Sequence, residues 1–279
     1  MNERVEVLLA TMNQKDLHIA EEMNVQSPLV IANQCDAYGY AENADAGIRM
    51  ISTATRGVGI NRNLALMHAR EDILLFSDDD MVYYDGYEQM ILEAYRELPD
   101  ADMIIFGIDM YRDGKKIPSS ARTQRVNVTN ALKYGTCRYS IRRRSVLKAD
   151  LHFSSLFGGG AQYSSGEDSL FLMDCLRAGL KVYTHHAVIA KNIRKPSTWF
   201  QGYNEKYFYD KGAWLACAFS CGRRLVQLYL GLRFRGMSTL GFFRRMQLMN
   251  AGIKGFPALR TYEEWRQQNA RSIGTYERV

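Results

Sequence analysis

The sequence has few of the features that mark membrane-spanning, disulfide-rich or fibrous proteins. The aromatic stretch at 212–222 carries no charge, but it is shorter than the roughly 20 apolar residues that a membrane-spanning helix needs. The five cysteines lack a repeated metal-ligand spacing, and no secretory hydrophobic segment opens the chain. Internal repeats and low-complexity tracts are also missing. We therefore expect a globular protein in a reducing cytoplasm.

Charge is unevenly divided along the 279 residues. The formal net charge of +6 alone would suit a protein that binds nucleic acid, a membrane surface or an anionic substrate. Residues 1–190, however, hold 20 Lys and Arg against 25 Asp and Glu, a net charge of −5, whereas residues 191–279 hold 16 against 5, a net charge of +11. With 47% hydrophobic residues the chain suits a large domain with an appendage, and we expect these to be residues 1–195 and 196–279.

Short apolar runs alternate with amphipathic stretches over the first 190 residues. The runs predict strands at 5–10, 29–32, 73–76, 103–106 and 181–189. The stretches predict helices at 64–69, 87–98 and 170–178, the first with Asn61 as its N-cap. Such alternation favours an α/β fold with a largely parallel sheet. Ligands of these sheets lie beyond the carboxyl ends of the strands, where the polar segments 11–14, 33–36 and 77–80 fall.

Three consecutive aspartates, Asp78, Asp79 and Asp80, directly follow the apolar run at 73–76. Like charges this close raise one another's pKa unless a cation or several hydrogen-bond donors neutralise them. In an extended segment Asp78 and Asp80 point to the same side and can share one ion, and carboxylate oxygens favour Mg²⁺ or Mn²⁺. The alternative is a solvated acidic turn that caps the following helix. The position at the ligand edge of the sheet favours the metal site.

Four short motifs occur in a fixed order along the chain. They are Thr11 after the first strand, Arg62-Asn63 at a helix start, Phe76 to Asp80 after a strand, and Gly166-Glu167-Asp168 before a helix. In this order and spacing the chain resembles family 2 glycosyltransferases of the GT-A fold, over roughly residues 4–200. The resemblance implies a Rossmann-like, mostly parallel mixed sheet flanked by helices. It also implies a nucleotide-sugar donor, a divalent cation, and single-displacement transfer with inversion at the anomeric carbon.

The resemblance assigns the metal and the donor's diphosphate to the acidic segment and to the helix start. Asp78-x-Asp80 resembles the family's Asp-x-Asp motif, with Asp80 as the ligand of Mn²⁺ or Mg²⁺. Asp78 would face the ribose or the uracil and share the ion, and Asp79 joins the donor-binding residues. Arg62 would contact the diphosphate, because an arginine at a helix N-terminus adds a charged donor there. A surface salt bridge is the alternative role for Arg62.

The residues expected to bind the base depart from the commonest family pattern. Thr11 and the loop from Asn33 to Asp36 lie where the family binds the base. In the family an Asp usually ends the second strand directly, whereas here Asn33, Gln34 and Cys35 come first. We expect a UDP-sugar donor, but which residue reads the base stays open.

The segment FGGGAQYSSGED at 157–168 carries the acceptor side of the predicted site. Its three glycines permit close approach of the backbone to a ligand. The resemblance makes Asp168 the general base that takes the proton of the acceptor hydroxyl, and Glu167 a residue that orients Asp168 or contacts the acceptor. Glu167 could equally serve as a helix-dipole partner at the start of the next helix.

The chain turns aromatic and basic beyond residue 195. The Gln-x-x-Arg-Trp motif of processive polysaccharide synthases is absent, and residues 196–199 resemble it only loosely. We therefore expect transfer of a single sugar to a saccharide or lipid-linked saccharide in cell-surface polysaccharide synthesis. This helical extension could lie on an anionic membrane, which would make the protein peripheral on the inner face. Alternatively, Trp214, Leu215, Phe219 and Leu225 could pack onto the catalytic domain, with arginine stems covering the rim.

Three other interpretations concern the whole chain or one further motif. A catalytically inactive nucleotide-sugar-binding subunit is disfavoured because Asp80 and Asp168 are both intact. A basic nucleic-acid-binding protein is disfavoured because the basic residues alternate with apolar ones in amphipathic stretches. The pair His185-His186 could add a metal or phosphate contact, although a structural role is more common for such pairs.

Overall fold

A computed structural model of the chain describes residues 3–112, 115–117, 122–128, 130–193 and 200–276. The chain divides into two compact units, one of residues 1–155 and 168–196 and the other of residues 156–167 and 197–279. The second unit thus includes the glycine-rich segment, which we had expected within residues 1–195. The segment 196–199 lies outside the described residues.

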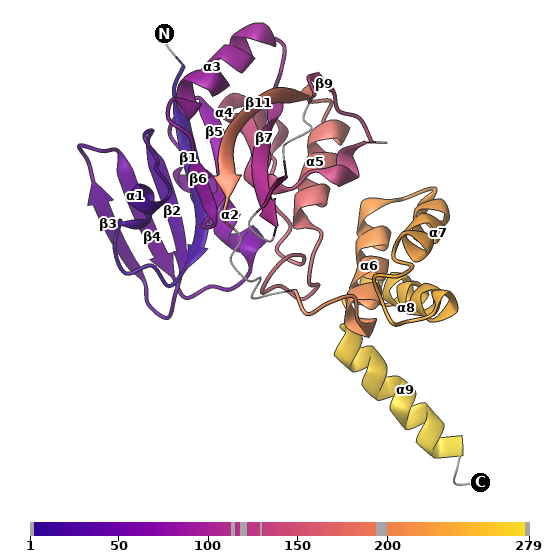
Figure 1. Ribbon diagram of the computed structural model, residues 1–279. Helices are drawn as coiled ribbons and strands as arrows, with labels where there is room; N and C mark the ends of the chain where they lie inside the picture. Colours follow the sequence, from indigo (N-terminus) through magenta and orange to yellow (C-terminus); the bar gives the residue numbers. More distant parts are fainter. Residues whose placement is uncertain (1–2, 113–114, 118–121, 129, 194–199, 277–279) are drawn as a thin grey trace. The chain divides into compact units, whose positions relative to one another are not determined.

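The first unit is built on a mixed sheet with a parallel centre (Figure 1). Its strands run in the order β3-β4-β2-β1-β5-β10-β7-β11-β6, with β8 paired to β7 and β9 to β11. Their bounds are Val5–Met12 (β1), Leu29–Gln34 (β2), Gly39–Asn43 (β3), Ile48–Thr53 (β4), Ile73–Asp78 (β5), Met81–Tyr83 (β6), Met103–Arg112 (β7), Lys115–Ile117 (β8), Gln124–Arg125 (β9), Tyr139–Arg142 (β10) and Val182–Asn192 (β11). The pairs β1–β2, β1–β5, β2–β4 and β7–β11 are parallel, whereas β10 is antiparallel to β5 and β7. The predicted α/β fold with a mixed sheet is confirmed.

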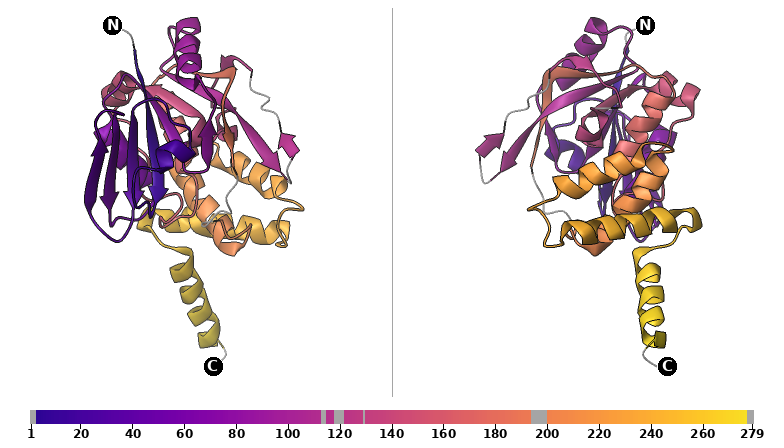
Figure 2. Two further views of the ribbon diagram at one scale, coloured as in Figure 1. Left: turned by 60° about the vertical axis from the view of Figure 1, so that its left-hand side comes forward. Right: turned by 90° about the vertical axis from the view of Figure 1, so that its right-hand side faces the viewer.

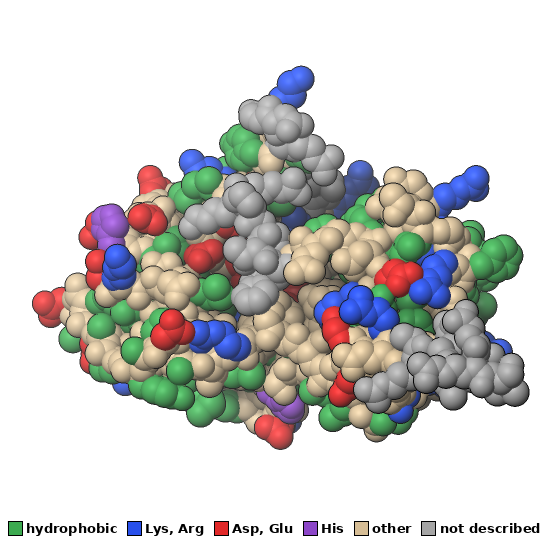
Figure 3. Space-filling model, turned by 90° about the horizontal axis from the view of Figure 1, so that it is seen from below, with side chains coloured by type: hydrophobic (Ala, Val, Ile, Leu, Met, Phe, Trp, Pro, Cys, Tyr) green, Lys and Arg blue, Asp and Glu red, His purple; other side chains and the backbone are tan. Residues whose placement is uncertain are grey.

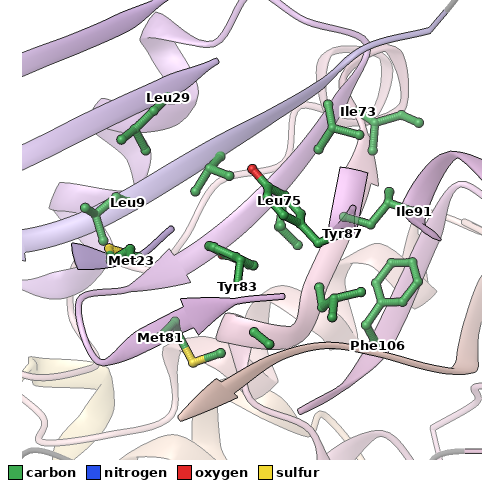
Figure 4. Close-up of a cluster of buried hydrophobic side chains, with 14 of the residues drawn as sticks. Leu9, Met23, Leu29, Ile73, Leu75, Met81, Tyr83, Tyr87, Ile91 and Phe106 are labelled. Carbon is green, nitrogen blue, oxygen red and sulfur yellow. The ribbon is translucent and has the colours of Figure 1, made fainter. Parts of the chain in front are cut away.

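Helices cover both faces of this sheet. They are α1 (Ile19–Glu22), α2 (Val58–His68), α3 (Tyr87–Glu97), α4 (Arg143–Ala149) and α5 (Glu167–Arg177). Successive strand residues point to opposite faces, so Leu9 packs with residues of α1 and α3, and Leu8 with residues of α2, α4 and α5. Figure 4 shows part of the first cluster, where Tyr87 and Ile91 of α3 lie beside strand residues such as Leu75.

Helix α2 begins earlier than predicted, and the assignment of Asn61 as its N-cap is wrong. The helix starts at Val58 with Gly57 as N-cap, which places Asn61 inside the helix and buries it. The Asn61 side-chain nitrogen donates to the backbone oxygens of Thr11, at 3.0 Å, and Ala32, at 2.8 Å. The amide therefore ties the helix to β1 and β2.

The second unit is helical, as predicted for the C-terminal extension. Its helices are α6 (Glu205–Ala218), α7 (Arg223–Arg233), α8 (Phe242–Gly255) and α9 (Tyr262–Tyr276). Figure 2 shows α6, α7 and α8 side by side in orange. Gly212 of α6 and Gly252 of α8 permit this packing, since a Cβ at either would lie within 2.1 Å of a carbonyl oxygen of the other helix. Along the described part of the chain, the helices are too short or too polar to cross a membrane.

Candidate active site

The carboxyl ends of β1, β2 and β5 bring three of the predicted polar segments together. In the parallel pairs, Thr11 lies opposite Asn33, and Ala10 lies opposite Asp78. The prediction that segments 11–14, 33–36 and 77–80 share one edge of the sheet is therefore confirmed. Each segment continues a strand that is buried on both faces, and its first polar side chains, such as Thr11, Asn33 and Ser77, are still buried.

Gln14 links two of the residues predicted to bind the base. Its side-chain nitrogen donates to the Thr11 hydroxyl at 2.9 Å, and its backbone nitrogen donates to Asn33 Oδ1 at 2.9 Å. Asn33 is fully buried and donates from Nδ2 to the Gln14 carbonyl and to the Ser52 hydroxyl, both at 3.0 Å. These bonds fix the loop after β1, so Asn33 shapes this edge through its neighbours.

Arg62 of α2 joins the two carboxylates that the motifs assign to opposite sides of the reaction. Its Nη1 lies 2.8 Å from Asp168 Oδ1, and its Nη2 lies 2.9 Å from Asp78 Oδ1. The arginine side chain is only 5% exposed, whereas those of Asp78 and Asp168 are 38% and 33% exposed. Arg62 therefore does not form the surface salt bridge considered as an alternative. It is a buried arginine that holds two accessible carboxylates.

Local packing explains how α2 delivers Arg62 to this place. Asn63 binds the backbone of Phe153 twice, accepting from its nitrogen at 2.7 Å and donating to its oxygen at 2.8 Å. A Cβ at Gly59 would lie 2.1 Å from the carbonyl oxygen of Ser154, so the helix can approach this segment only with glycine there. In the Arg62-Asn63 motif, one side chain reaches the site and the next anchors the helix.

Asp168 has a second partner that the sequence did not reveal. Thr136 lies in a 3₁₀ turn at Thr136–Arg138, and its hydroxyl donates to Asp168 Oδ1. The same oxygen also accepts a hydrogen bond from Arg62. Glu167 is buried, and its Oε2 accepts from the backbone nitrogen of Gly166 at 3.1 Å. Nothing in the residues around Thr136 resembles a known motif, so no local signal pointed to it.

The three aspartates have different surroundings. Asp79 Oδ2 accepts a hydrogen bond from the Thr11 hydroxyl at 2.7 Å. Burial raises the pKa of the Asp80 carboxyl above its usual value, and the neighbouring charges of Asp78 and Asp79 raise it further, while a hydrogen bond from the Asn192 side chain opposes them. β5 ends at Asp78, and Asp79 and Asp80 form a turn that leads into the short strand β6. The turn of the alternative is therefore present, but it caps no helix, and the extended conformation expected through Asp80 is wrong.

The acidic segment suits a metal site in which the protein supplies only one or two of the ligands. Among the residues that the structure describes, no group of three or more His, Cys, Asp or Glu side chains is placed to hold a metal ion by itself. Mg²⁺, however, commonly takes one or two carboxylates from a protein and completes its shell with water and phosphate oxygens. The carboxyl of Asp80, half-buried beside two further carboxylates, fits this share, because a cation would offset the charge repulsion that helps to raise its pKa.

Some predicted residues have partners outside this group. The Asp36 side chain is 95% exposed and forms an ion pair with Arg56 at 2.5 Å. His185 is buried and lies 3.0 Å from a carboxylate oxygen of Glu97, with its ring centroid 4.3 Å from that of His186. The glycines at 158–160 belong to a loop closed by backbone hydrogen bonds that join Leu156 and Gly158 to Tyr163.

Comparisons with known proteins agree with this fold. Residues 34–151 match the family model described as Glycosyl transferase family 2, which confirms the predicted resemblance for that part of the chain. The fold is GT-A-like and similar to that of S. aureus TarS, with a TM-score of 0.57 and 16% identity over 83% of this chain and 43% of the TarS chain. This chain therefore spans less than half the length of TarS. No curated protein matches the sequence.

Two solved complexes share the same fold. TarS 1–349 in complex with UDP-GlcNAc has a TM-score of 0.57 and 15% identity, over 94% of this chain and 77% of that one. TarS 1–349 in complex with UDP has a TM-score of 0.55 and 16% identity, over 95% of this chain and 78% of that one. At these identities the likeness establishes the fold, and the chemistry must be argued from this chain's own residues.

Proposed function

We propose that the protein is an inverting, metal-dependent glycosyltransferase of the cytoplasm. It would transfer one sugar from a UDP-sugar to a saccharide or lipid-linked saccharide during cell-surface polysaccharide synthesis. The observation that carries the proposal is the contact of one buried guanidinium, that of Arg62, with Asp78 of the Asp-x-Asp motif and with Asp168 of the Glu-Asp motif. The family match and the UDP complexes of a protein with this fold support the donor class.

The acceptor side of the reaction rests on Asp168. Arg62 and Thr136 both donate to its Oδ1, which fixes the direction of the carboxylate, so we assign Oδ2 to the acceptor hydroxyl. As the acceptor oxygen bonds to the anomeric carbon, its proton passes to Asp168, and the bond from that carbon to the diphosphate breaks. The electron pair of the broken bond leaves on the nucleoside diphosphate. Glu167 would help to place the acceptor.

The donor side rests on the edge formed by β1, β2 and β5. Asp80, together with Asp78, would hold Mn²⁺ or Mg²⁺, and when bound this cation supplies positive charge that stabilises the diphosphate leaving group. Arg62 would add a second positive group toward the diphosphate. The base and ribose would bind along the other donor residues, which are Thr11, Asp36 and Asp79, at the edge that Asn33 shapes through its neighbours.

The test is to measure binding and transfer separately on the whole chain. By calorimetry we expect UDP to bind when Mn²⁺ is present and to bind much more weakly when EDTA removes the metal. We expect Asp168→Asn to bind UDP as the wild type does. Its rate of UDP release from a panel of UDP-sugars should be lower by a factor of about a hundred or more, because a general base contributes about that factor or more.

The control is Asp174→Asn, which removes a carboxylate from the same helix, where Asp174 pairs with Arg177 at the surface. This variant should keep both UDP binding and UDP release. Undiminished turnover by Asp168→Asn would refute the base assignment. Binding of UDP without turnover by the wild type would favour the inactive subunit, and binding of nucleic acid in place of UDP would favour the nucleic-acid-binding protein.

A further inference from the structure

Helix α7 presents a row of hydrophobic side chains to solvent. Leu225, Leu228, Tyr229 and Leu232 are 75%, 44%, 54% and 56% exposed. They recur every three or four residues, so at about 100° per residue they fall within about 100° of one another around the helix axis. We call these four residues the outer stripe. Exposed apolar groups gathered in this way mark interaction surfaces more often than scattered ones do.

The opposite face of α7 is already occupied within the second unit. Gln227 donates from its side chain to the backbone oxygen of Met246, at 3.3 Å, and to Asn250 Oδ1, at 2.9 Å, both on α8. A Cβ at Gly231 would lie 2.8 Å from Met246 Sδ, so the two helices are in close contact there. Packing against α8 therefore fixes the rotation of α7 and turns the outer stripe outward.

Arginines flank the outer stripe on both sides. At about 100° per residue, Arg224 and Arg233 lie about 90° to either side of its centre. Long arginine side chains in such positions cover apolar surface with their stems and carry the guanidinium to a polar boundary. The stretch of chain that carries α7 has charge of one sign, because residues 211–262 contain nine Lys and Arg and no Asp or Glu, although Arg244 of α8 pairs with Glu205 of α6.

We propose that the outer stripe lies in the interface of an anionic lipid membrane, with Arg224 and Arg233 at the lipid phosphates. An apolar centre with basic edges on a single helix is the pattern of interfacial helices. A second copy of the chain fits less well, because the segment offers no acidic side chain to meet the arginines across a two-fold axis. Nucleic acid would gain little from four exposed hydrophobic residues at the centre of its binding surface.

Burial differs among the residues of the extension for which packing and membrane contact were both considered. Trp214 and Leu215 are buried and therefore closed to a membrane, and their packing onto the catalytic domain stays a prediction. Leu225 is not covered, and the membrane interpretation applies to its helix. The inference is independent of the proposed catalysis, since none of the residues of the outer stripe belongs to the candidate active site.

The test compares flotation of the whole protein with vesicles of phosphatidylcholine alone and with vesicles that also contain about 30% phosphatidylglycerol. We expect binding to the mixed vesicles only. Leu225→Glu/Leu232→Glu should lower the bound fraction roughly tenfold or more, since each removes an apolar side chain from the interface. Arg224→Gln/Arg233→Gln should lower binding by a similar factor through lost attraction to phosphate.

Matched controls lie on α4 of the first unit. Leu147→Glu makes one such change at a leucine that is 63% exposed, and Arg144→Gln/Lys148→Gln removes two positive charges from exposed positions. Both should float as the wild type does.

The proposal is overturned if the wild type does not float, or if these controls lose binding as much as the α7 variants. It is also overturned if the wild type is a dimer that Leu225→Glu/Leu232→Glu converts to a monomer without any effect on vesicles. UDP binding, measured on every variant, reports separately on the candidate active site.

Discussion

At the scale of single residues, the geometry of one guanidinium connects the two halves of the candidate site. Arg62 uses two nitrogens for two carboxylates, and a lysine has only one ammonium nitrogen with which to replace them. We expect Arg62→Lys to leave one carboxylate without its donor and to lower the free energy of unfolding by about 1–3 kcal/mol. UDP release from UDP-sugars should also slow about tenfold or more, since the direction of Asp168 depends on Arg62.

Chemical denaturation and the UDP-release assay check this prediction. Arg177→Lys is the control, because Arg177 forms a half-exposed pair with Asp174 that contributes little. If Arg62→Lys were as stable and active as the control, the bridge between Asp78 and Asp168 would have no role in either property.

The sequence identified those site residues that belong to motifs, and it missed those that only the fold brings close. Asp78, Asp168 and Arg62 could be predicted because each belongs to a recognisable order of motifs. Thr136 lies in a 3₁₀ turn without such a pattern, and it meets Asp168 only through tertiary packing. Asn192 was missed because the predicted strand ended at residue 189, whereas β11 continues to Asn192 and reaches Asp80.

At the scale of elements, the approach of α2 to the segment at 153–155 sets the position of the candidate site. A methyl group at position 59 would need to occupy the place of the Ser154 carbonyl oxygen. We expect Gly59→Ala to lower the free energy of unfolding by about 1–3 kcal/mol and to weaken UDP-sugar turnover, because α2 must shift and carry Arg62 with it. Thermal and chemical unfolding measure the first effect, and UDP release measures the second.

Gly39→Ala provides the comparison. Gly39 lies on the exposed strand β3, and its added Cβ would have its nearest neighbour 3.9 Å away, which is ordinary contact. Its stability should stay within about 0.5 kcal/mol of the wild type. A Gly59→Ala protein as stable as Gly39→Ala would show that the two segments can separate without cost.

The elements found from the sequence are those with strong local patterns. The buried strands β1, β2 and β5 are continuous apolar runs, and α3 has a clear helical period, so each could be predicted within a few residues. The missed strands are short, exposed or mixed in composition, such as β3 with the sequence GYAEN and β10 with YSIR. Their conformation depends on pairing with neighbours that lie far away in the sequence, and no local period encodes it.

At the scale of the whole molecule, the net charge of +6 combines regions of opposite sign. Figure 3 shows acidic as well as basic side chains on the face that it draws. The acidic groups of the candidate site are matched by a buried arginine, two threonines and an asparagine. The arginines that flank the outer stripe of α7 lie in a stretch without acidic residues, and in the proposed membrane contact the lipid phosphates balance them.

These two kinds of electrostatic interaction should respond differently to salt. Exposed charges are largely screened at about 0.5 M salt, where the Debye length is about 4 Å, whereas partly buried groups are screened much less. Between about 0.1 and 0.5 M NaCl we therefore expect binding to anionic vesicles to fall tenfold or more, while the affinity for UDP with Mn²⁺ falls much less. Flotation and calorimetry on the same protein samples measure both quantities.

Arg224→Gln/Arg233→Gln should flatten the salt dependence of vesicle binding and leave that of UDP binding unchanged. A parallel fall of both affinities would mean that one exposed basic surface serves both ligands, and it would contradict the assignment of UDP to the buried Arg62 and of lipid to α7.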